Sequence, residues 1–194
     1  MDYQSLKHTF ESYSQRKTYF EETFSGILGE SAIESLIEAG FLTAPASTKY
    51  HGSYEGGLFD HSVNVTAALV DLSHYNSLIW EDDSAYVSPI KIGILHDLCK
   101  IDQYKKVTDD EGCPEGYFAW NDEPIIKGHG IKSVLYAQML GIELNVEEVA
   151  CITYHMGAFT PEKEWKDYTS AIHKYPNVLW THQADMIATH ILEV

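Results

Sequence analysis

Apolar residues recur at intervals of three and four along most of the chain, the spacing that places side chains on one face of an α-helix. Aromatic residues at this spacing predict a first helix over residues 3–24. Ser31 followed by Glu34 is a capping-box signature for a short second helix, and Gly40 is a typical residue to close it. A longer apolar face predicts a third helix over 58–74.

Further helices are predicted from their start signals. Pro89 suits the first turn of a fourth helix, which we expect to carry His96 and Asp97, and Asn145 with Glu148 forms a second capping-box signature. Between them, a helix is predicted to open beside Gly128 and Gly130 and to run toward Leu140. The last two helices are predicted over 162–174 and 177–192.

Two segments break the helical pattern. Residues 43–57 contain one proline and three glycines, which predict a loop. Residues 102–123 hold two short runs rich in aromatic and β-branched residues, separated by an acidic turn, and this pattern is typical of a β-hairpin. We therefore predict an all-α helical bundle with a small β-hairpin insertion near 102–123.

Length and composition favour one domain. The chain has 194 residues, of which 44% are hydrophobic, enough to build one sizeable core. We expect residues 1–45 to form an N-terminal helical extension that packs on a core of residues 46–194. No apolar run approaches the roughly 20 residues of a membrane helix, and the polar N-terminus does not resemble a signal peptide.

The cysteines match no zinc-ribbon spacing. Cys99, Cys113 and Cys151 are far apart and odd in number, so we interpret them as packing residues with free thiols. Free thiols are typical of a reducing compartment, and we expect a cytoplasmic protein.

The charge balance is strongly acidic. Lys and Arg total 13 against 29 Asp and Glu, a formal net charge of −16, and no basic stripe follows any predicted helix. Proteins that hold long nucleic acids usually display a positive track along the phosphate backbone. The composition therefore disfavours long nucleic acid as a partner and favours a small ligand.

Histidines and aspartates recur at intervals that suit successive helices of one bundle. A buried His-Asp pair is costly unless a cation holds it, and nitrogen with carboxylate ligands suits iron, manganese, zinc or magnesium. The candidate metal ligands, each in or beside a separate predicted helix apart from the adjacent pair, are His61, His96, Asp97, His129, His155 and Asp185.

This order of histidines and aspartates resembles the HD-domain superfamily of metal-dependent phosphohydrolases, over roughly His51 to Asp185. The segment HGSYEGGLFDHSVNV, which begins at His51, is similar to the motif that opens the HD domain in bacterial 3′–5′ exoribonucleases and their small relatives. The chain departs from those proteins at Gly52, where a second histidine is usual, and at Cys99, where glycine or alanine usually precedes the lysine.

The resemblance implies a hydrolase that acts through one or two divalent cations. In the two-cation form, Asp97 bridges both positions; a one-cation form, without His129 and His155, also occurs among the relatives. The presence of both histidines favours two cations, whose identity among Fe, Mn, Mg, Ni and Zn the sequence leaves open. The first position would use His61, His96, Asp97 and Asp185, and the second would use Asp97, His129 and His155.

The implied activity is that of a metal-dependent phosphohydrolase or phosphodiesterase with a metal-activated hydroxide as nucleophile. Its substrate would be a nucleotide, a short oligonucleotide or another small phosphate ester. Lys100 would contact a substrate phosphate, or merely complement a helix C-terminus. His51 would protonate a leaving oxygen, or be an ordinary loop histidine. His182, one turn before Asp185, would orient a ligand, form a pocket wall or pack without a functional role.

Several aromatic residues are candidates to stack on a base, although a packed core explains aromatic residues more often. These candidates are Tyr54, Tyr154, Phe159 and Trp165.

Two functions from other classes remain open. Some HD-fold proteins use this ligand set in a mixed-valence di-iron oxygenase, and Lys100 favours phosphate chemistry over that reading. A non-catalytic metal-binding regulatory domain is the second alternative, and the intact ligand set argues against it. The sequence does not indicate the oligomeric state.

Overall fold

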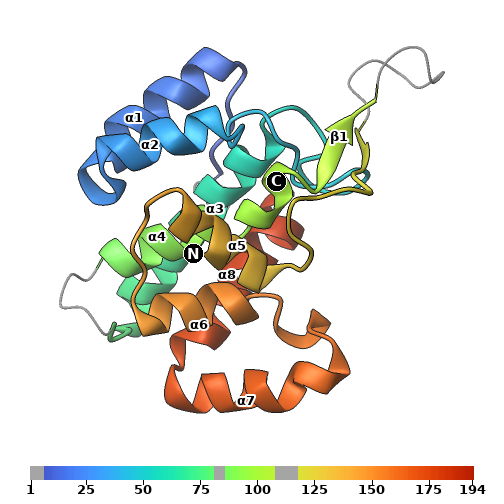
Figure 1. Cartoon of the computed structure of the whole chain (residues 1–194). Helices are drawn as coiled ribbons and strands as arrows, with labels where there is room; N and C mark the ends of the chain where they lie inside the picture. The colour runs from blue at the N-terminus through green and yellow to red at the C-terminus, as the bar shows by residue number, and fades with distance from the viewer. Residues whose placement is uncertain (1–6, 81–85, 108–117) are drawn as a thin grey trace.

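The central element of the structure is helix α3, Gly57–Asn76, whose side chains are buried over most of its length. The computed structural model describes residues 7–80, 86–107 and 118–194. In this part of the chain α4 and α8 pack along α3, α6 packs on both α4 and α8, and α5 packs on α6 (Figure 1). The other α-helices are α1 Tyr13–Leu28, α2 Glu30–Glu38, α4 Val87–Leu95, α5 Gly130–Met139, α6 Val146–Tyr154, α7 Trp165–Lys174 and α8 Asn177–Ile187.

Short elements join these helices. The 3₁₀-helices are η2 Leu98–Ile101, η4 Gly157–Phe159 and η5 Glu162–Glu164, and the π-helical turn η6 covers Ala188–Leu192. Strands β1 Tyr104–Lys106 and β2 Phe118–Trp120 pair antiparallel, with Tyr104 opposite Trp120. The predicted all-α class with a small hairpin is thus confirmed. The acidic turn of that hairpin and Cys113 lie outside the described residues.

The N-terminal helices pack on α3 through an aromatic cluster. Phe20 of α1 contacts both Phe41 and Phe59, with ring centroids 5.5 Å apart in each pair. Beside this cluster, buried Arg16 donates to Asp60 Oδ1 at 2.7 Å, and Tyr54 donates its hydroxyl to the same carboxylate at 2.9 Å. Together these contacts hold the start of α3 and the glycine-rich loop before it in place. The division at residue 45 stays a prediction.

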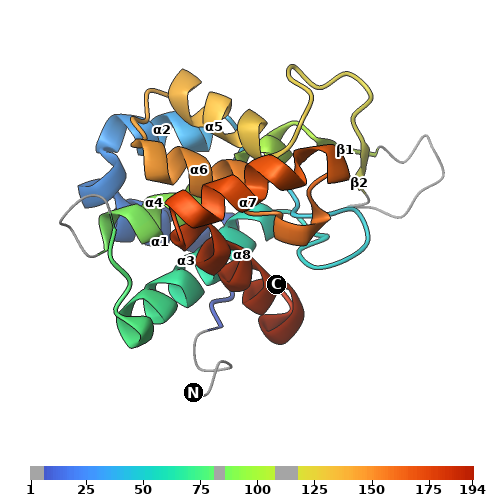
Figure 2. The same ribbon diagram turned by 90° about the horizontal axis from the view of Figure 1, so that it is seen from below.

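Figure 2 shows α7 on the outside of the bundle, over α6 and α8. The capping box predicted from Asn145 and Glu148 is confirmed, because each side chain accepts a hydrogen bond from the backbone N–H of the other. Within the described part of the chain, none of the helices combines the length and the apolar character that crossing a bilayer requires.

Three boundary predictions were wrong. The first helix begins at Tyr13, because the Ser12 side chain caps it there, and residues 7–12 are not helical. Helix α2 begins at Glu30, directly after Gly29 at φ +87°, so Ser31 lies inside it and is not its cap. The helix before the His-Asp pair ends at Leu95, which places that pair at a break in the helix.

Candidate metal centre

The histidines and aspartates singled out in the sequence converge on one buried point. His61 lies in α3 and Asp185 in α8. The other four lie at helix ends, where a side chain can turn into the space between helices. His96 caps the C-terminus of α4, Asp97 precedes η2, His129 precedes α5 and His155 caps the C-terminus of α6.

The Asp97 carboxylate lies at the centre of the cluster and is almost completely buried. Its two oxygens face different histidines, as expected of a residue that bridges two positions. Oδ1 lies 3.1 Å from Nε2 of His129 and 3.5 Å from Nε2 of His155. Oδ2 lies 3.5 Å from Nε2 of His96 and 3.8 Å from Nε2 of His61.

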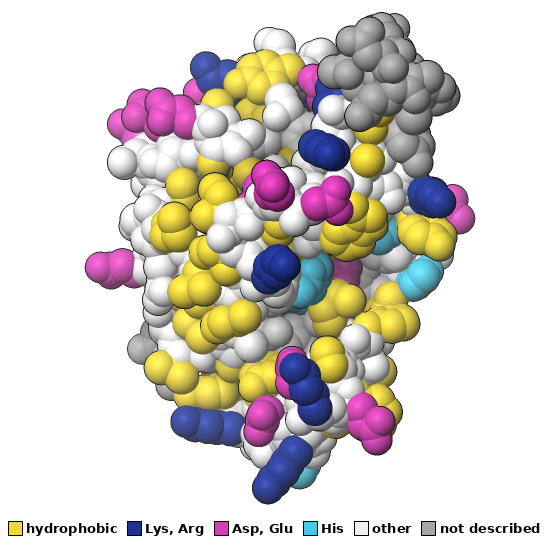
Figure 3. All heavy atoms as spheres, turned by 45° about the vertical axis from the view of Figure 1, so that its right-hand side comes forward, with side chains coloured by type: hydrophobic (Ala, Val, Ile, Leu, Met, Phe, Trp, Pro, Cys, Tyr) yellow, Lys and Arg dark blue, Asp and Glu magenta, His cyan; other side chains and the backbone are white. Residues whose placement is uncertain are grey.

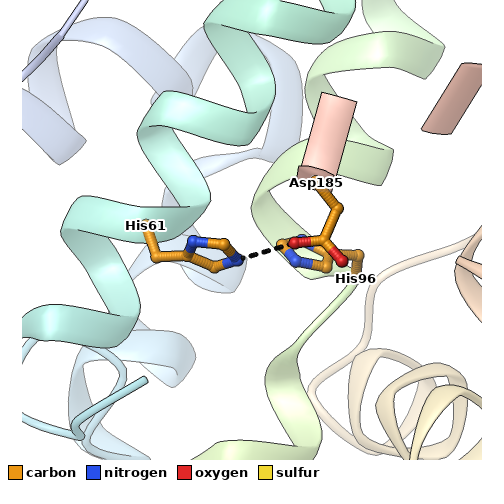
Figure 4. Close-up of side chains that lie close together, drawn as sticks. All are labelled: His61, His96 and Asp185. Atoms are coloured by element: carbon orange, nitrogen blue, oxygen red, sulfur yellow. Dashed lines mark ion pairs between the residues drawn. The ribbon is translucent and has the colours of Figure 1, made fainter. Parts of the chain in front are cut away.

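Asp185 faces the same histidines from α8. Figure 4 shows the His61 ring reaching from α3 toward the Asp185 carboxylate, with the His96 ring next to both. Nε2 of His61 is 3.2 Å from Asp185 Oδ1, and the Thr189 hydroxyl donates to the same oxygen at 3.3 Å.

Backbone carbonyls fix the orientation of three of these rings. The Nδ1 atoms of His61, His96 and His155 lie 2.7–2.9 Å from carbonyl oxygens of Val194, Gly93 and Ile152, respectively. A carbonyl only accepts, so each Nδ1 carries a proton, and each ring turns its Nε2 toward the cluster. This outer hydrogen bond is the arrangement found behind most metal-binding histidines.

Ring nitrogens and carboxylate oxygens therefore crowd together in the cluster, and two of the ring nitrogens have no hydrogen-bond partner in the described part of the chain. Nε2 of His61 and Nε2 of His96 are buried and lack a hydrogen-bond partner among the described residues. Lone pairs and carboxylate oxygens this close repel one another unless a cation or a proton lies between them. The donor atoms of His61, His96 and Asp185 lie within 4.8 Å of one another, as do those of His96, Asp97 and His155. These groups can hold a metal ion.

The electrostatics of the site keep both carboxylates ionised. Burial alone would raise the pKa of Asp97, but the charge of Lys100 and the facing imidazoles outweigh burial and hold that pKa well below its usual range. Burial is likewise outweighed at Asp185, where the facing His61 ring lowers the pKa. Two ionised carboxylates are the hard ligands that divalent cations prefer.

Lys100 lies at the base of the cavity next to this cluster. Its ammonium is 2.6 Å from Asp97 Oδ2 and is almost buried. Burial opposes its charge, yet the adjacent Asp97 carboxylate raises the pKa of Lys100. The lysine is therefore charged and lines the cavity, although in this structure its nearest partner is the aspartate.

His51 lies beside the cluster, with its ring 4.9 Å from that of His61. Burial, reinforced by the nearby His61 and Lys100, lowers the pKa of His51 to about 4. The ring is therefore neutral at pH 7, which suits donation of a hydrogen bond better than donation of a proton. Its neighbour Gly52 has φ +57°, and a Cβ there would lie 2.6 Å from Ala46 Cβ. A histidine at position 52 would be strained in this loop.

Cys99, which we predicted to be a packing residue, also contacts the cluster. The buried Sγ lies 3.2 Å from Nδ1 of His129 and 3.9 Å from Asp97 Oδ1. Burial, together with the Asp97 charge, raises the pKa of this thiol, so it stays protonated and holds the partly exposed His129 ring by hydrogen bonding. Cys151 is buried and free. His182 donates from Nδ1 to the His155 carbonyl at 2.9 Å, so it supports the end of α6.

A cavity of about 390 Å³ opens onto the cluster. Figure 3 shows histidine side chains around a hollow with an acidic side chain at its bottom and hydrophobic side chains along its border. Of the aromatic residues predicted to stack on a base, Phe159 lines this cavity, whereas Tyr54, Tyr154 and Trp165 do not. The cavity lining also includes Trp120, which sequence reasoning missed because pairing across the hairpin determines where it lies.

Comparison with known proteins gives one distant relative. Over 122 residues, the chain is 24% identical to the dihydroneopterin 2′,3′-cyclic phosphate phosphodiesterase of Methanocaldococcus jannaschii. The match covers 62% of this chain and 45% of that protein, so the chain corresponds to less than half of its relative. No profile of a known protein family matches the chain, and no solved structure matches it. The relative is a hydrolase of a small phosphate diester.

Proposed function

We propose that this protein is a metal-dependent phosphodiesterase of the HD type that hydrolyses a small phosphate diester. The observation that carries the proposal is the set of three imidazoles whose Nδ1 atoms are held by backbone carbonyls and whose Nε2 atoms face the buried carboxylate of Asp97 and the partly buried carboxylate of Asp185. Two buried ring nitrogens without a hydrogen-bond partner among the described residues, those of His61 and His96, are costly unless a cation binds there. The distant phosphodiesterase relative supports the same class of reaction.

The proposed ligand set follows from which atoms face one another. One cation would be held by His61, His96, Asp97 and Asp185, and a second by Asp97, His129 and His155. Divalent cations bound there would lower the pKa of water for attack on phosphorus and would neutralise charge on the phosphoryl oxygens.

The rest of the site binds and orients the ester. Lys100 lines the cavity as a buried cation and would attract a phosphoryl oxygen to the cluster. His51 borders the same cavity and, as a neutral ring, would donate a hydrogen bond to the leaving oxygen. Lys100 and His51 line the same cavity, so both could contact one bound ester.

The size and charge of the molecule favour a small substrate. A cavity of about 390 Å³ lies at the lower end of the range that small-molecule sites occupy. The net charge of −16 would repel an extended phosphate chain, whereas a short ester meets mainly the cluster and Lys100. A cyclic phosphodiester, the substrate class named for the relative, meets both conditions.

The test combines metal content with hydrolysis. Protein purified without chelators should carry at least one equivalent of divalent metal and should hydrolyse 2′,3′-cyclic AMP faster than the monoester AMP. Asp97→Ala should abolish both properties, whereas Asp71→Ala, which removes a carboxylate of α3 outside the cluster, should retain them. Less than one equivalent of metal together with no hydrolysis would refute the proposal. Oxygen consumption by the iron-loaded protein without ester hydrolysis would instead support the oxygenase reading.

A further inference from the structure

Three aromatic side chains on the rim of the cavity are unusually exposed. Tyr50 is 81% exposed, Phe159 67% and Trp120 60%, and all three line the cavity above the cluster. They come from separate segments: the loop before α3, η4 and strand β2. Single exposed aromatic residues are common on protein surfaces, but three gathered on one cavity mark a recognition surface.

Trp120 is the best supported of the three. It pairs across the hairpin with Tyr104, whose ring centroid lies 5.2 Å from its own in an edge-to-face arrangement. The next residue, Asn121, donates from its side chain to the Asp102 carbonyl at 2.8 Å. The Tyr104 ring therefore packs against the indole, while Trp120 stays exposed enough to line the cavity.

The base of this hairpin is anchored to the bundle. Asp102 pairs with the buried Lys132 of α5 and accepts a hydrogen bond from the Tyr136 hydroxyl at 2.7 Å. The backbone N–H of Ile125 donates to the same carboxylate at 2.8 Å. A stacking surface that is already fixed loses little entropy when a ligand binds, so this anchoring suits a binding role for Trp120.

Charge divides the cavity into two parts. Its only described acidic lining residues are Asp97 and Asp185 at the bottom, and Lys100 lies beside them. The aromatic rim carries no ionised side chain of its own, in contrast to the strongly acidic chain as a whole. A ligand that fits both parts has an anionic group at one end and a flat apolar ring at the other.

We propose that Trp120, backed by Tyr104, stacks on the planar heterocycle of a phosphate ester whose phosphate lies at the His-Asp cluster. This inference rests on the proposed function for the position of the phosphate, and it adds the chemical class of the group that the phosphate carries. Trp120 is then a specificity residue that contacts substrate. Stacking of one base on an aromatic side chain strengthens binding by about 5- to 150-fold.

The experiment compares two ligands that share a ribose 5-phosphate group, one with a base at C1′ and one with a hydroxyl there. AMP and ribose 5-phosphate are titrated calorimetrically into the metal-loaded protein, into Trp120→Ala, into Trp120→Phe and into a control, Tyr75→Ala. Tyr75 is a comparably exposed aromatic residue, 66% exposed, that does not line the cavity. Circular dichroism of each variant checks the fold.

The wild-type protein should bind AMP at least about 5-fold more tightly than ribose 5-phosphate. Trp120→Ala should remove most of this difference and leave the affinity for ribose 5-phosphate unchanged, while Trp120→Phe should keep most of it and Tyr75→Ala all of it. Equal affinity of the wild type for the two ligands, or an equal loss for both in Trp120→Ala, would overturn the inference.

Hydrolysis separates this inference from the proposed function. If 2′,3′-cyclic AMP is hydrolysed but AMP and ribose 5-phosphate bind equally, the phosphodiesterase stands and the stacking role of Trp120 is refuted. If ring-dependent binding through Trp120 is present without hydrolysis, the stacking site stands and the proposed reaction is refuted. A nucleobase and a pterin share this planar chemistry, so a parallel titration with neopterin monophosphate shows which of the two the site prefers.

Discussion

Replacing Gly93 with alanine should destabilise this protein, although alanine is the better helix former. Gly93 lies in α4 where that helix crosses α3, and a Cβ there would lie 2.5 Å from Thr66 Cα and 2.8 Å from Thr66 N. Ordinary contact begins at 3.4 Å. Because these are backbone atoms, no side-chain rotation relieves the overlap, and the two helices must separate by about 1 Å.

Two opposing effects determine how far Gly93→Ala changes the free energy of unfolding. Overpacking of a core costs about 1–3 kcal/mol, and a clash with backbone belongs at the upper end of that range. Alanine regains about 1 kcal/mol of helix propensity, which leaves a net loss of about 2 kcal/mol. For a chain of this length the loss corresponds to a Tm lower by about 4–8 °C. Gly93 also supplies the carbonyl that holds His96 at 2.8 Å, so a displacement of α4 should weaken metal binding as well.

Gly26→Ala provides the matched control. Gly26 lies in α1, and a Cβ there would meet nothing within 4 Å. That variant should gain the helix-propensity term alone and melt about 2–4 °C higher than the wild type. Thermal melts followed by circular dichroism, with metal titrations at 25 °C, measure both effects. If Gly93→Ala melts higher than the wild type, as Gly26→Ala should, the close helix crossing is not a constraint and the reasoning fails.

Three further predictions address the cluster, the hairpin anchor and the substrate. Asp97→Ala should lose metal at both proposed positions, and His129→Ala should lose it only at the second. Equal metal-to-protein ratios in the wild type and the His129 variant, measured by mass spectrometry, would contradict a two-cation site. The pKa of Asp102 lies below its usual value, because its hydrogen bonds and the Lys132 charge outweigh burial. The ionised Asp102 therefore stabilises the fold fully above about pH 4, and this stabilisation is lost as pH falls through the lowered pKa. Urea unfolding should accordingly show Asp102→Asn less stable than the wild type by about 1–3 kcal/mol at pH 7, with the gap narrowing below pH 4; a constant gap would refute the assignment. A long single-stranded RNA should be degraded more slowly than a small phosphodiester, and added salt should help only the RNA by screening repulsion; processive degradation of that RNA at low salt would favour an exoribonuclease.

Much of the fold was predictable because helices of this chain carry regular apolar faces. The helix predicted over 58–74 appears as α3, and the hairpin strands lie within the predicted segment. The convergence of the histidines and aspartates was also predictable, since each lies in or beside a separate helix and a bundle brings such positions together. Local patterns were enough for these features.

Features that depend on tertiary contacts were not predictable. Helical spacing alone did not reveal that α4 ends before His96 or that Asp97 lies in a break. The carbonyl of Val194 that holds His61 is 133 residues away in sequence, so no local pattern reports it. The position of Trp120 on the cavity follows from strand pairing, and Ser31 fails as a cap because the helix starts two residues earlier, after Gly29.

The placement of the six candidate ligands on α3, α8 and four helix ends has a consequence for how the protein assembles. They span residues 61 to 185, so the cluster exists only after helices distant in sequence have docked. Contacts of such long range are closed late in folding, because chain entropy must be lost before they form. We therefore expect a newly made chain to capture metal as one of its last folding steps. Before that step its buried acceptors repel one another, and metal supply would determine how much of the chain reaches the mature state in a cell.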